Sequence, residues 1–253
     1  MSAAFGRALE GKVVLVTGGS RGIGAAIAEA AAQAGASVAV MARTQPSATA
    51  ERVIAAGGRA IAIAGDVSVE ADAEAAVAHV VAQYGRIDVL VNNAAVLGVA
   101  PLLTGSVELF DEVMAVNVRG PFLMTRAAGR IMAERGSGVI INIGSDLAER
   151  GRAEYVSYAA SKGALLQMTR SAAIELGAAG VRVVLVSPAV TNTEMAAPVL
   201  SDPVLRAEFI AKGTLDTVNE PEDVAATVVF LASPAARTVT GCNWPVDAGV
   251  LAR

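Results

Sequence analysis

The chain has 253 residues, of which 54% are hydrophobic and 17% are charged, and its formal net charge is −4. This length suits one large α/β domain, and the apolar content is enough for a sizeable core. The negative net charge and the lack of any basic run argue against nucleic acid as a partner. A single cysteine, Cys242, excludes an internal disulfide, and with a single histidine, His79, a transition-metal site is not expected.

No apolar run reaches the roughly 18 residues that a membrane-spanning helix needs. Residues 1–10 lack the hydrophobic core and cleavage site of a signal peptide, so we expect a cytoplasmic protein. His79 lies in a stretch of helical character with no nucleophile elbow nearby, which argues against a Ser-His-Asp hydrolase. The charged fraction is below the usual quarter or so, which fits either hidden subunit contacts or a general richness in alanine.

Short aliphatic runs alternate with helical stretches along most of the chain. The first run, residues 13–16, is flanked by Gly11 and Gly18 and is typical of a buried parallel strand. A helical stretch at residues 22–33 follows and stops at Gly35. Further strands are expected at residues 37–41, 60–64, 87–91, 139–143, 181–186 and 243–246, and further helices at 47–56, 69–84, 107–134, 155–179 and 221–232.

This alternation predicts a parallel sheet with helices on both faces, which is the doubly wound or Rossmann α/β fold. We expect a single domain over residues 1–253, with no repeats and no linker. Pro121 predicts a break or kink within the helical stretch at residues 107–134. From residue 189 to residue 213 the alternation lapses, and the segment is mixed and contains Pro198 and Pro203.

Glycines gather at the first strand-to-helix junction, where residues 17–24 read Thr-Gly-Gly-Ser-Arg-Gly-Ile-Gly. Their spacing differs from the G-x-G-x-x-G fingerprint, and a tight structural turn would also use such residues. Glycine permits positive φ and a close approach of the backbone to a ligand. Because the turn opens a helix at the carboxyl end of a strand, it favours a dinucleotide phosphate site.

The end of the second strand indicates which dinucleotide is bound. Sites that favour NAD place an acid there for the ribose 2′-OH, but this strand ends in Arg43 and Thr44. Arg43 and Arg21 of the glycine turn suit a 2′-phosphate, although each arginine alone could be a solvated surface charge. The sequence therefore favours NADP(H) over NAD(H).

Tyr158 and Lys162 are four residues apart and lie on one face of a predicted helix. A nearby ammonium lowers the pKa of a phenol, so Tyr158 could donate a proton to a carbonyl oxygen or remove one from an alcohol. Ser145 follows the strand at 139–143, where its hydroxyl could bind the substrate oxygen. Asn93 and Asn117 lie in apolar settings, where a buried structural amide is the simplest interpretation.

Taken together, these residues resemble the short-chain dehydrogenase/reductase family, in its short single-domain branch, over essentially the whole chain. The resemblance implies that Tyr158 is the catalytic acid/base and that Ser145 orients the carbonyl. It implies that Lys162 binds the nicotinamide ribose and lowers the pKa of Tyr158, while Asn117 holds a water that relays protons. The matching residues are Thr17-Gly18-xxx-Gly22-x-Gly24, Asp66, Asn92-Asn93-Ala94, Asn117, Ser145, Tyr158-xxx-Lys162 and Pro188 to Thr193.

The resemblance also assigns cofactor contacts. Asp66 and Val67 would contact the adenine, and Asn93 would support the sheet beside the cofactor. Val190 and Thr193 would lie on the nicotinamide side, and the chain would form a homotetramer or homodimer. The expected cofactor-binding residues are Gly18, Ser20, Arg21, Gly22, Ile23, Gly24, Arg43, Asp66, Val67, Asn93, Tyr158, Lys162, Pro188, Val190 and Thr193.

Three positions depart from the family pattern, since Ala95, Ala189 and Ala248 replace its usual glycines. Each adds a methyl group where backbone and cofactor usually run close. We expect adjusted loops rather than lost cofactor binding.

The sequence thus predicts an NADPH-dependent carbonyl reductase or alcohol dehydrogenase. A mainly apolar substrate lid at about residues 190–213 predicts a moderately hydrophobic ketone or alcohol, without a clear anion clamp. One alternative is a reductase of conjugated C=C bonds, because such relatives space tyrosine and lysine seven apart, as Tyr155 and Lys162 are. The other is a non-catalytic NADP(H)-sensing protein.

Overall fold

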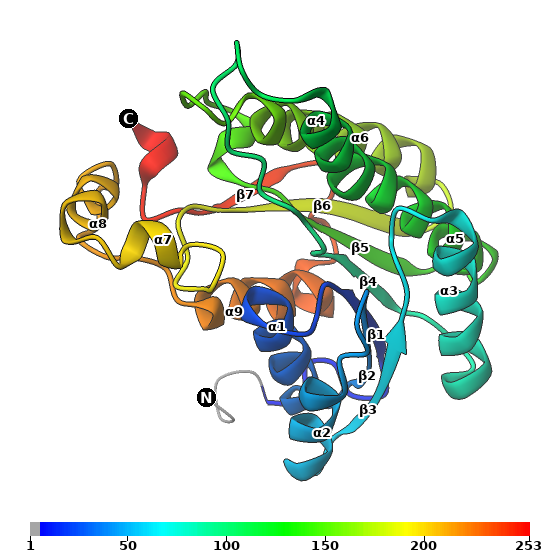
Figure 1. The fold of residues 1–253 in the computed structure, drawn as a ribbon. Coiled ribbons are helices and arrows are strands. Elements are labelled where there is room, and N and C mark those ends of the chain that lie inside the picture. Colours follow the sequence, from blue (N-terminus) through cyan, green and yellow to red (C-terminus); the bar gives the residue numbers. More distant parts are fainter. Residues whose placement is uncertain (1–5) are drawn as a thin grey trace.

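The computed structural model describes residues 6–253, so part of the stretch examined for a signal peptide lies outside the described residues. Seven parallel strands form one sheet in the order β3-β2-β1-β4-β5-β6-β7 (Figure 1). The predicted doubly wound fold is confirmed. The strands are β1 Val13–Thr17, β2 Ser37–Ala42, β3 Arg59–Ala64, β4 Val89–Asn92, β5 Gly138–Ile143, β6 Val181–Pro188 and β7 Asn243–Val246.

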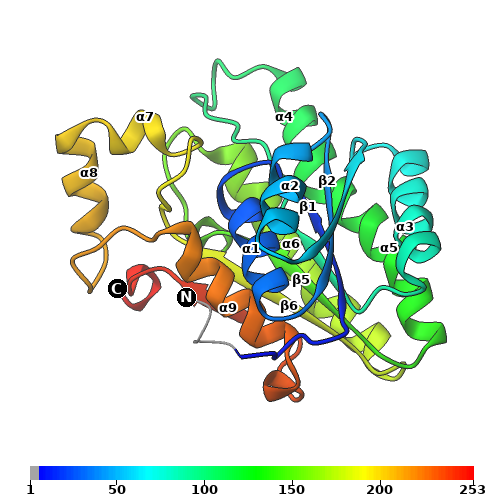
Figure 2. The same ribbon diagram turned by 90° about the horizontal axis from the view of Figure 1, so that it is seen from below.

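Helices cover both faces of the sheet (Figures 1 and 2). Successive β1 residues point to opposite faces: Val14 and Val16 pack in the core layer of α1 and α9, whereas Val13 and Leu15 pack in that of α3 and α5. Burial on both faces explains the continuous apolar run in this strand. The helices are α1 Gly22–Gln33, α2 Ser47–Ala55, α3 Glu70–Tyr84, α4 Val107–Met114, α5 Gly120–Glu134, α6 Val156–Gly177, α7 Ala197–Leu200, α8 Pro203–Ile210 and α9 Pro221–Ala232.

The strand order reverses between β1 and β4, and ligands of such sheets bind outside the carboxyl strand ends at this point. The glycine turn after β1 and the loops after β4, β5 and β6 all emerge at this edge. The topology therefore brings together the motifs that are far apart in the sequence. No helix within residues 6–253 is both long and apolar enough to cross a bilayer.

Two regions differ in detail from the sequence prediction. The expected break near Pro121 lies just before it, where a π-helical turn, Ala115–Arg119, joins α4 to α5. Pro121 itself occupies the first turn of α5, directly after this π-helical turn.

Residues 189–213, which looked irregular in sequence, contain two short helices and are called the α7–α8 segment below. Pro198 and Pro203 stand in the first turns of α7 and α8, so they begin these helices rather than disrupt them. Asp202 caps α8 by accepting hydrogen bonds from the N–H groups of Val204 (2.8 Å) and Leu205 (3.2 Å). The segment projects from the body of the molecule beside the carboxyl strand ends (Figure 1).

Candidate active site

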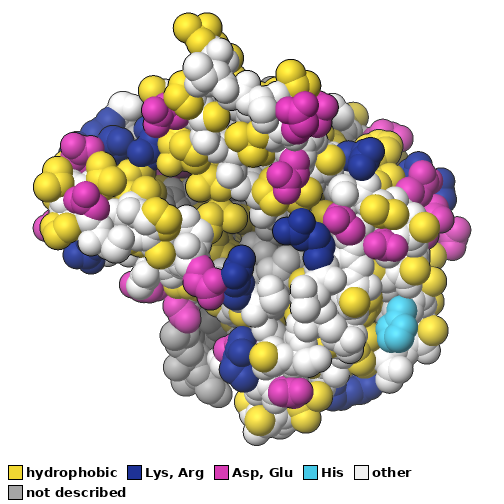
Figure 3. Space-filling model, viewed as in Figure 1, with side chains coloured by type: hydrophobic (Ala, Val, Ile, Leu, Met, Phe, Trp, Pro, Cys, Tyr) yellow, Lys and Arg dark blue, Asp and Glu magenta, His cyan; other side chains and the backbone are white. Residues whose placement is uncertain are grey.

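A cavity of about 580 Å³ lies along the carboxyl ends of the strands. Its walls come from the glycine turn, the loops after β2, β3 and β4, the end of β5, the start of α6 and the α7–α8 segment. This face is visibly hollowed, with Lys and Arg side chains at the rim (Figure 3). All the expected cofactor-binding residues line the cavity, as does Ser145, whereas Asn117 lies outside the lining.

The glycine turn is built for close backbone contact. Gly18 and Gly22 have φ values of +63° and +54°, which favour glycine. A Cβ at Gly18 would lie 2.7 Å from the Cα of Ala94, so the turn and the loop after β4 touch directly. Arg21, the N-cap of α1, makes no side-chain cap, and the first turn of α1 contains no acid. The N–H groups that begin α1 are therefore open to an anion.

Asn93 fixes the loop after β4 against the glycine turn. Its Nδ2 donates to the carbonyl oxygens of Thr17 and Gly18, each at 3.0 Å. Its backbone N–H donates to the Thr17 hydroxyl, also at 3.0 Å. The side chain thus joins the ends of β1 and β4 beside the cavity, where the sequence had placed it as a support.

The two arginines of the expected 2′-phosphate site are in different situations. Arg43 is exposed at the end of β2, and none of the ion pairs within residues 6–253 involves it. Arg21 instead donates to Glu194 of the α7–α8 segment at 2.6 Å. This ion pair joins residues 173 positions apart, and no local pattern in the sequence could have indicated it.

Asp66 follows β3 near Arg43. Its carboxylate accepts hydrogen bonds from the N–H (2.8 Å) and the hydroxyl (2.7 Å) of Ser68. Burial works against ionisation of Asp66, but these bonds and the charges of Arg43 and Arg119 outweigh it, so the pKa of Asp66 is lowered. The carboxylate is therefore held ionised and in a fixed orientation at this end of the cavity.

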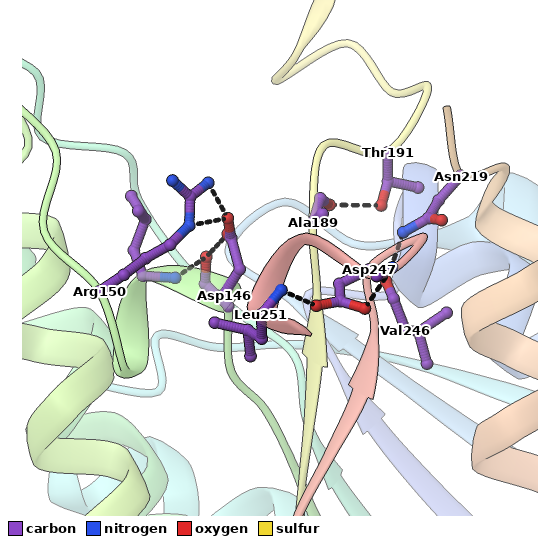
Figure 4. A network of polar contacts seen from close by, with 11 residues as sticks. Asp146, Arg150, Ala189, Thr191, Asn219, Val246, Asp247 and Leu251 are labelled. Carbon is purple, nitrogen blue, oxygen red and sulfur yellow. Dashed lines mark hydrogen bonds and ion pairs between the residues drawn. The ribbon is translucent and has the colours of Figure 1, made fainter. Parts of the chain in front are cut away.

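Ser145 is buried after β5 and its hydroxyl has two partners. It donates to Oδ1 of Asp146 at 2.9 Å and accepts from the N–H of Leu147 at 3.2 Å. Asp146 is paired in turn with Arg150, whose Nε lies 2.8 Å from Oδ2 (Figure 4). The sequence analysis did not identify Asp146 as part of the site. The available signal was its position next to Ser145, with an arginine four residues further on.

Tyr158 and Lys162 lie one turn apart on α6, as their spacing predicted. The Lys162 Nζ is 5.4 Å from the centroid of the Tyr158 ring, and it donates to the carbonyl of Ile143 at 2.8 Å. Lys162 is 3% exposed, and burial lowers its pKa to about 8.

The pKa of Tyr158 moves opposite to the direction expected from Lys162 alone. Burial raises this pKa, the charge of Asp146 adds to the rise, and the Ser145 hydroxyl partly opposes it. The resemblance had implied a lowered value. Burial has the largest effect on this pKa. Tyr158 carries its proton at neutral pH, as an ordinary phenol does, and can act as an acid.

Asn117 is fully buried behind the cavity wall, on the π-helical turn. Its Oδ1 accepts the N–H of Val96 at 2.9 Å, and its Nδ2 donates to the Val96 carbonyl (3.0 Å) and to the Ser161 hydroxyl (3.1 Å). Both side-chain N–H groups are therefore in use. Asn117 fixes the loop after β4 to α6, and a relay water would need another of its groups, such as the backbone carbonyl.

The three alanines that replace family glycines are not equivalent. Ala248 has a φ of +53°, in the left-handed region, whereas Ala95 and Ala189 line the cavity without a positive φ. The methyl groups of Ala95 and Ala189 therefore add no backbone strain. Ala248 follows Asp247, whose carboxylate accepts the N–H groups of Gly249 (2.9 Å) and Leu251 (2.8 Å) and holds the C-terminal turn beside the α7–α8 segment (Figure 4).

The fold and the site together define the class of protein as an oxidoreductase. The chain matches, over residues 18–251, the family model described as Enoyl-(Acyl carrier protein) reductase. It belongs to the short-chain dehydrogenase/reductase family.

Known members resemble it along nearly their full length. D-threitol dehydrogenase from Mycolicibacterium smegmatis is 38% identical over 253 residues, covering 98% of this chain and 96% of that protein. A structure described as an NAD(P)-dependent gluconate 5-dehydrogenase from Beutenbergia cavernae, with NADP at low occupancy, is 36% identical with a TM-score of 0.93, covering 98% and 99%. A short-chain dehydrogenase from Burkholderia cenocepacia in complex with NADP is 35% identical with a TM-score of 0.89, covering 96% and 99%.

Proposed function

We propose that this protein is an NADP(H)-dependent carbonyl reductase, or an alcohol dehydrogenase in the reverse direction. The observation that carries the proposal is the meeting of Ser145, Tyr158 and Lys162 in one cavity. A protonated phenol beside a hydroxyl donor and an ammonium matches the needs of a carbonyl oxygen that gains negative charge.

In this mechanism Tyr158 donates its proton to the substrate oxygen, and Ser145 donates a hydrogen bond to the same oxygen. The Ser145 hydroxyl now donates to Asp146, so binding of a carbonyl would redirect that hydrogen. Lys162 stabilises the phenolate that Tyr158 becomes, and Asn117 contributes to the proton path behind it. NADPH, when bound, supplies the hydride.

The cavity has the donors that NADP(H) requires. The open N–H groups at the start of α1 suit the pyrophosphate, and Arg43 suits the 2′-phosphate. Asp66 and Val67 would contact the adenine, and Val190 and Thr193 the nicotinamide. The NADP in the structures from Beutenbergia cavernae and Burkholderia cenocepacia supports this choice.

The α7–α8 segment is proposed as the substrate lid. Met195, Val199 and Phe209 bring apolar surface to the cavity, which suits a small, moderately hydrophobic ketone or alcohol. We further propose that the protein is a cytoplasmic homodimer or homotetramer.

The central test is Tyr158→Phe, assayed with NADPH and a panel of ketones. The proposal predicts that turnover falls by about 100-fold or more, the range of general acid catalysis, while NADPH binding stays within about twofold. Tyr84→Phe, a tyrosine of α3 remote from the cavity, is the matched control. Turnover retained by Tyr158→Phe would exclude the assigned acid.

The cofactor preference has its own test. Arg43→Ala should raise the Kd of NADPH by about 10- to 100-fold and leave that of NADH nearly unchanged, because a charge-assisted hydrogen bond to phosphate is lost. Equal losses for both cofactors would refute the 2′-phosphate role.

A second candidate is reduction of conjugated C=C bonds, favoured by the description of the matched family model and by Tyr155, which also lines the cavity. Enones in the same NADPH assay separate the two functions. If enones are reduced and Tyr155→Phe rather than Tyr158→Phe abolishes turnover, this second function holds.

A further inference from the structure

Arg152 is a cation on the substrate side of the cavity with no acid of its own. It lines the cavity and is partly buried, and its guanidinium carbon lies 4.5 Å from the centroid of the Tyr155 ring and 4.2 Å from that of Phe209. These cation–π contacts with the two rings hold the guanidinium in place. None of the side-chain hydrogen bonds or ion pairs within residues 6–253 uses its N–H groups.

Arg43, at the end of β2, shares this feature, but two other arginines of the cavity do not. Arg150 is paired with Asp146, and Arg21 is paired with Glu194. Both charges are therefore balanced within the chain. Arg152 lines the cavity with side-chain donors that the described chain does not use, so they are available to an acceptor on a bound ligand.

A second unpaired cation lies behind it. The Lys212 ammonium is 4.6 Å from the centroid of the same Phe209 ring. Burial and the charges of Arg152 and Arg150 lower the pKa of Lys212, and Glu208 and Asp146 only partly oppose this. Arg152 and Lys212 thus pack on the same Phe209 ring, and no ion pair within residues 6–253 involves either of them.

We propose that Arg152, with Lys212 behind it, binds an anionic end group of the substrate, so that the reacting ketone or alcohol carries a carboxylate, sulfonate or phosphate. This assignment rests on the proposed carbonyl reductase function and sharpens its substrate class. The apolar residues of the α7–α8 segment then cover the carbon chain of the substrate, and Arg152 binds the anionic group at its end.

Arg152 and the proton donor Tyr158 line the same cavity. One substrate can therefore meet both residues, and short ketones that carry an anionic group are the first substrates to test.

The experiment compares anionic ketones with neutral partners under NADPH, using levulinate with its methyl ester, acetonesulfonate with butanone, and dihydroxyacetone phosphate with dihydroxyacetone. The native protein should prefer the anion in at least one pair, which also identifies the anion. In Arg152→Gln the anion-to-neutral ratio of kcat/KM should fall by about 10- to 100-fold, as expected for lost charge-assisted hydrogen bonds. Arg152→Lys should keep part of the ratio, because the charge remains without the bidentate geometry.

Arg206→Gln is the matched control, because Arg206 is exposed on α8 and does not line the cavity. It removes one positive charge outside the cavity and should leave the ratio unchanged. A native preference for the neutral partners, or equal ratios in the native protein and Arg152→Gln, would overturn the anion site.

A binding measurement keeps the two proposals separable. Calorimetric titration of the NADP⁺-loaded protein with valerate and with valeramide requires no turnover. Tighter binding of valerate that is lost in Arg152→Gln supports the anion site even if no ketone is reduced, a result that would refute only the reductase function. Equal binding of valerate and valeramide, with all ketone pairs inert, would refute both.

Discussion

At the scale of single residues, the reactivity of Tyr158 depends on two neighbours with opposite effects. Asp146 raises the pKa of the phenol and so disfavours the phenolate, whereas the Lys162 ammonium favours the phenolate left after proton donation. Arg150 holds Asp146 in place through an ion pair. Asp146 and Lys162 therefore shift the proton affinity of Tyr158 in opposite directions.

The pKa values of Lys162 and Tyr158 predict how the rate of ketone reduction depends on pH. The pKa of Lys162 is lowered to about 8, so its ammonium is lost as pH rises through that value. The pKa of Tyr158 is raised, so the phenol keeps its proton over the same range. The kcat/KM for ketone reduction should therefore be level near neutral pH and fall above about pH 8.

A pH profile of the native protein and Lys162→Arg checks this. A guanidinium stays protonated throughout, so the decline above about pH 8 should disappear in Lys162→Arg, even if its overall activity is lower. Lys12→Arg, at a partly buried lysine before β1 that does not line the cavity, serves as the control and should keep the decline. The same decline in Lys162→Arg would mean that another group controls it.

The sequence allowed part of this site to be predicted. Four-residue spacing placed Tyr158 and Lys162 on one helix face because that relation is local. The direction in which the pKa of Tyr158 shifts was not predictable. It depends on burial and on Asp146, which lies after the end of β5 and not on α6. Arg152 was overlooked for the same reason, as its aromatic partner Phe209 belongs to α8.

At the scale of elements, prediction succeeded where one physical rule dominates. Strands buried on both faces are continuous apolar runs, so their positions were found to within a few residues. The π-helical turn was not predicted. Its Asn117 forms hydrogen bonds with Val96 and Ser161, and contacts between such distant residues leave no periodic pattern in the sequence. The helices of the α7–α8 segment were not predicted because they are short, with four and eight residues, and the segment shows no regular apolar period.

The ion pair between Arg21 and Glu194 joins the glycine turn to the α7–α8 segment, and it competes with the proposed cofactor role of Arg21. Both side chains are more than two-thirds exposed, so the pair is worth at most about 1 kcal/mol. Glu194→Gln should release Arg21 and tighten NADPH binding by up to about fivefold, with NADH unaffected.

Titration of both cofactors, followed by nicotinamide fluorescence, measures this change. Glu222→Gln, an exposed acid in the first turn of α9, controls for the loss of one negative charge. If Glu194→Gln changes the Kd of NADPH and NADH equally, Arg21 does not contact the 2′-phosphate.

At the scale of the whole molecule, most helices cover the sheet, but α4 is poorly covered by its own chain. Val113 is the only buried residue of α4, while Val107 and Phe110 are 69% and 42% exposed. Leu102 and Leu103, just before α4, are 70% and 95% exposed. Single exposed apolar residues are ordinary, but four along one short stretch indicate a surface that another molecule covers.

We predict that this surface, formed by Leu102, Leu103, Val107 and Phe110, contacts a second copy of the chain. Light scattering should give twice or four times the mass of one chain, and Phe110→Asp should lower it, because an unpaired carboxylate buried in an apolar contact is costly. Ile54→Asp, on α2, places the same charge at a similarly exposed apolar position and should leave the mass unchanged. A monomeric native protein, or a Phe110→Asp variant of unchanged mass, would show that α4 is not the contact, and the low charged fraction would then reflect composition alone.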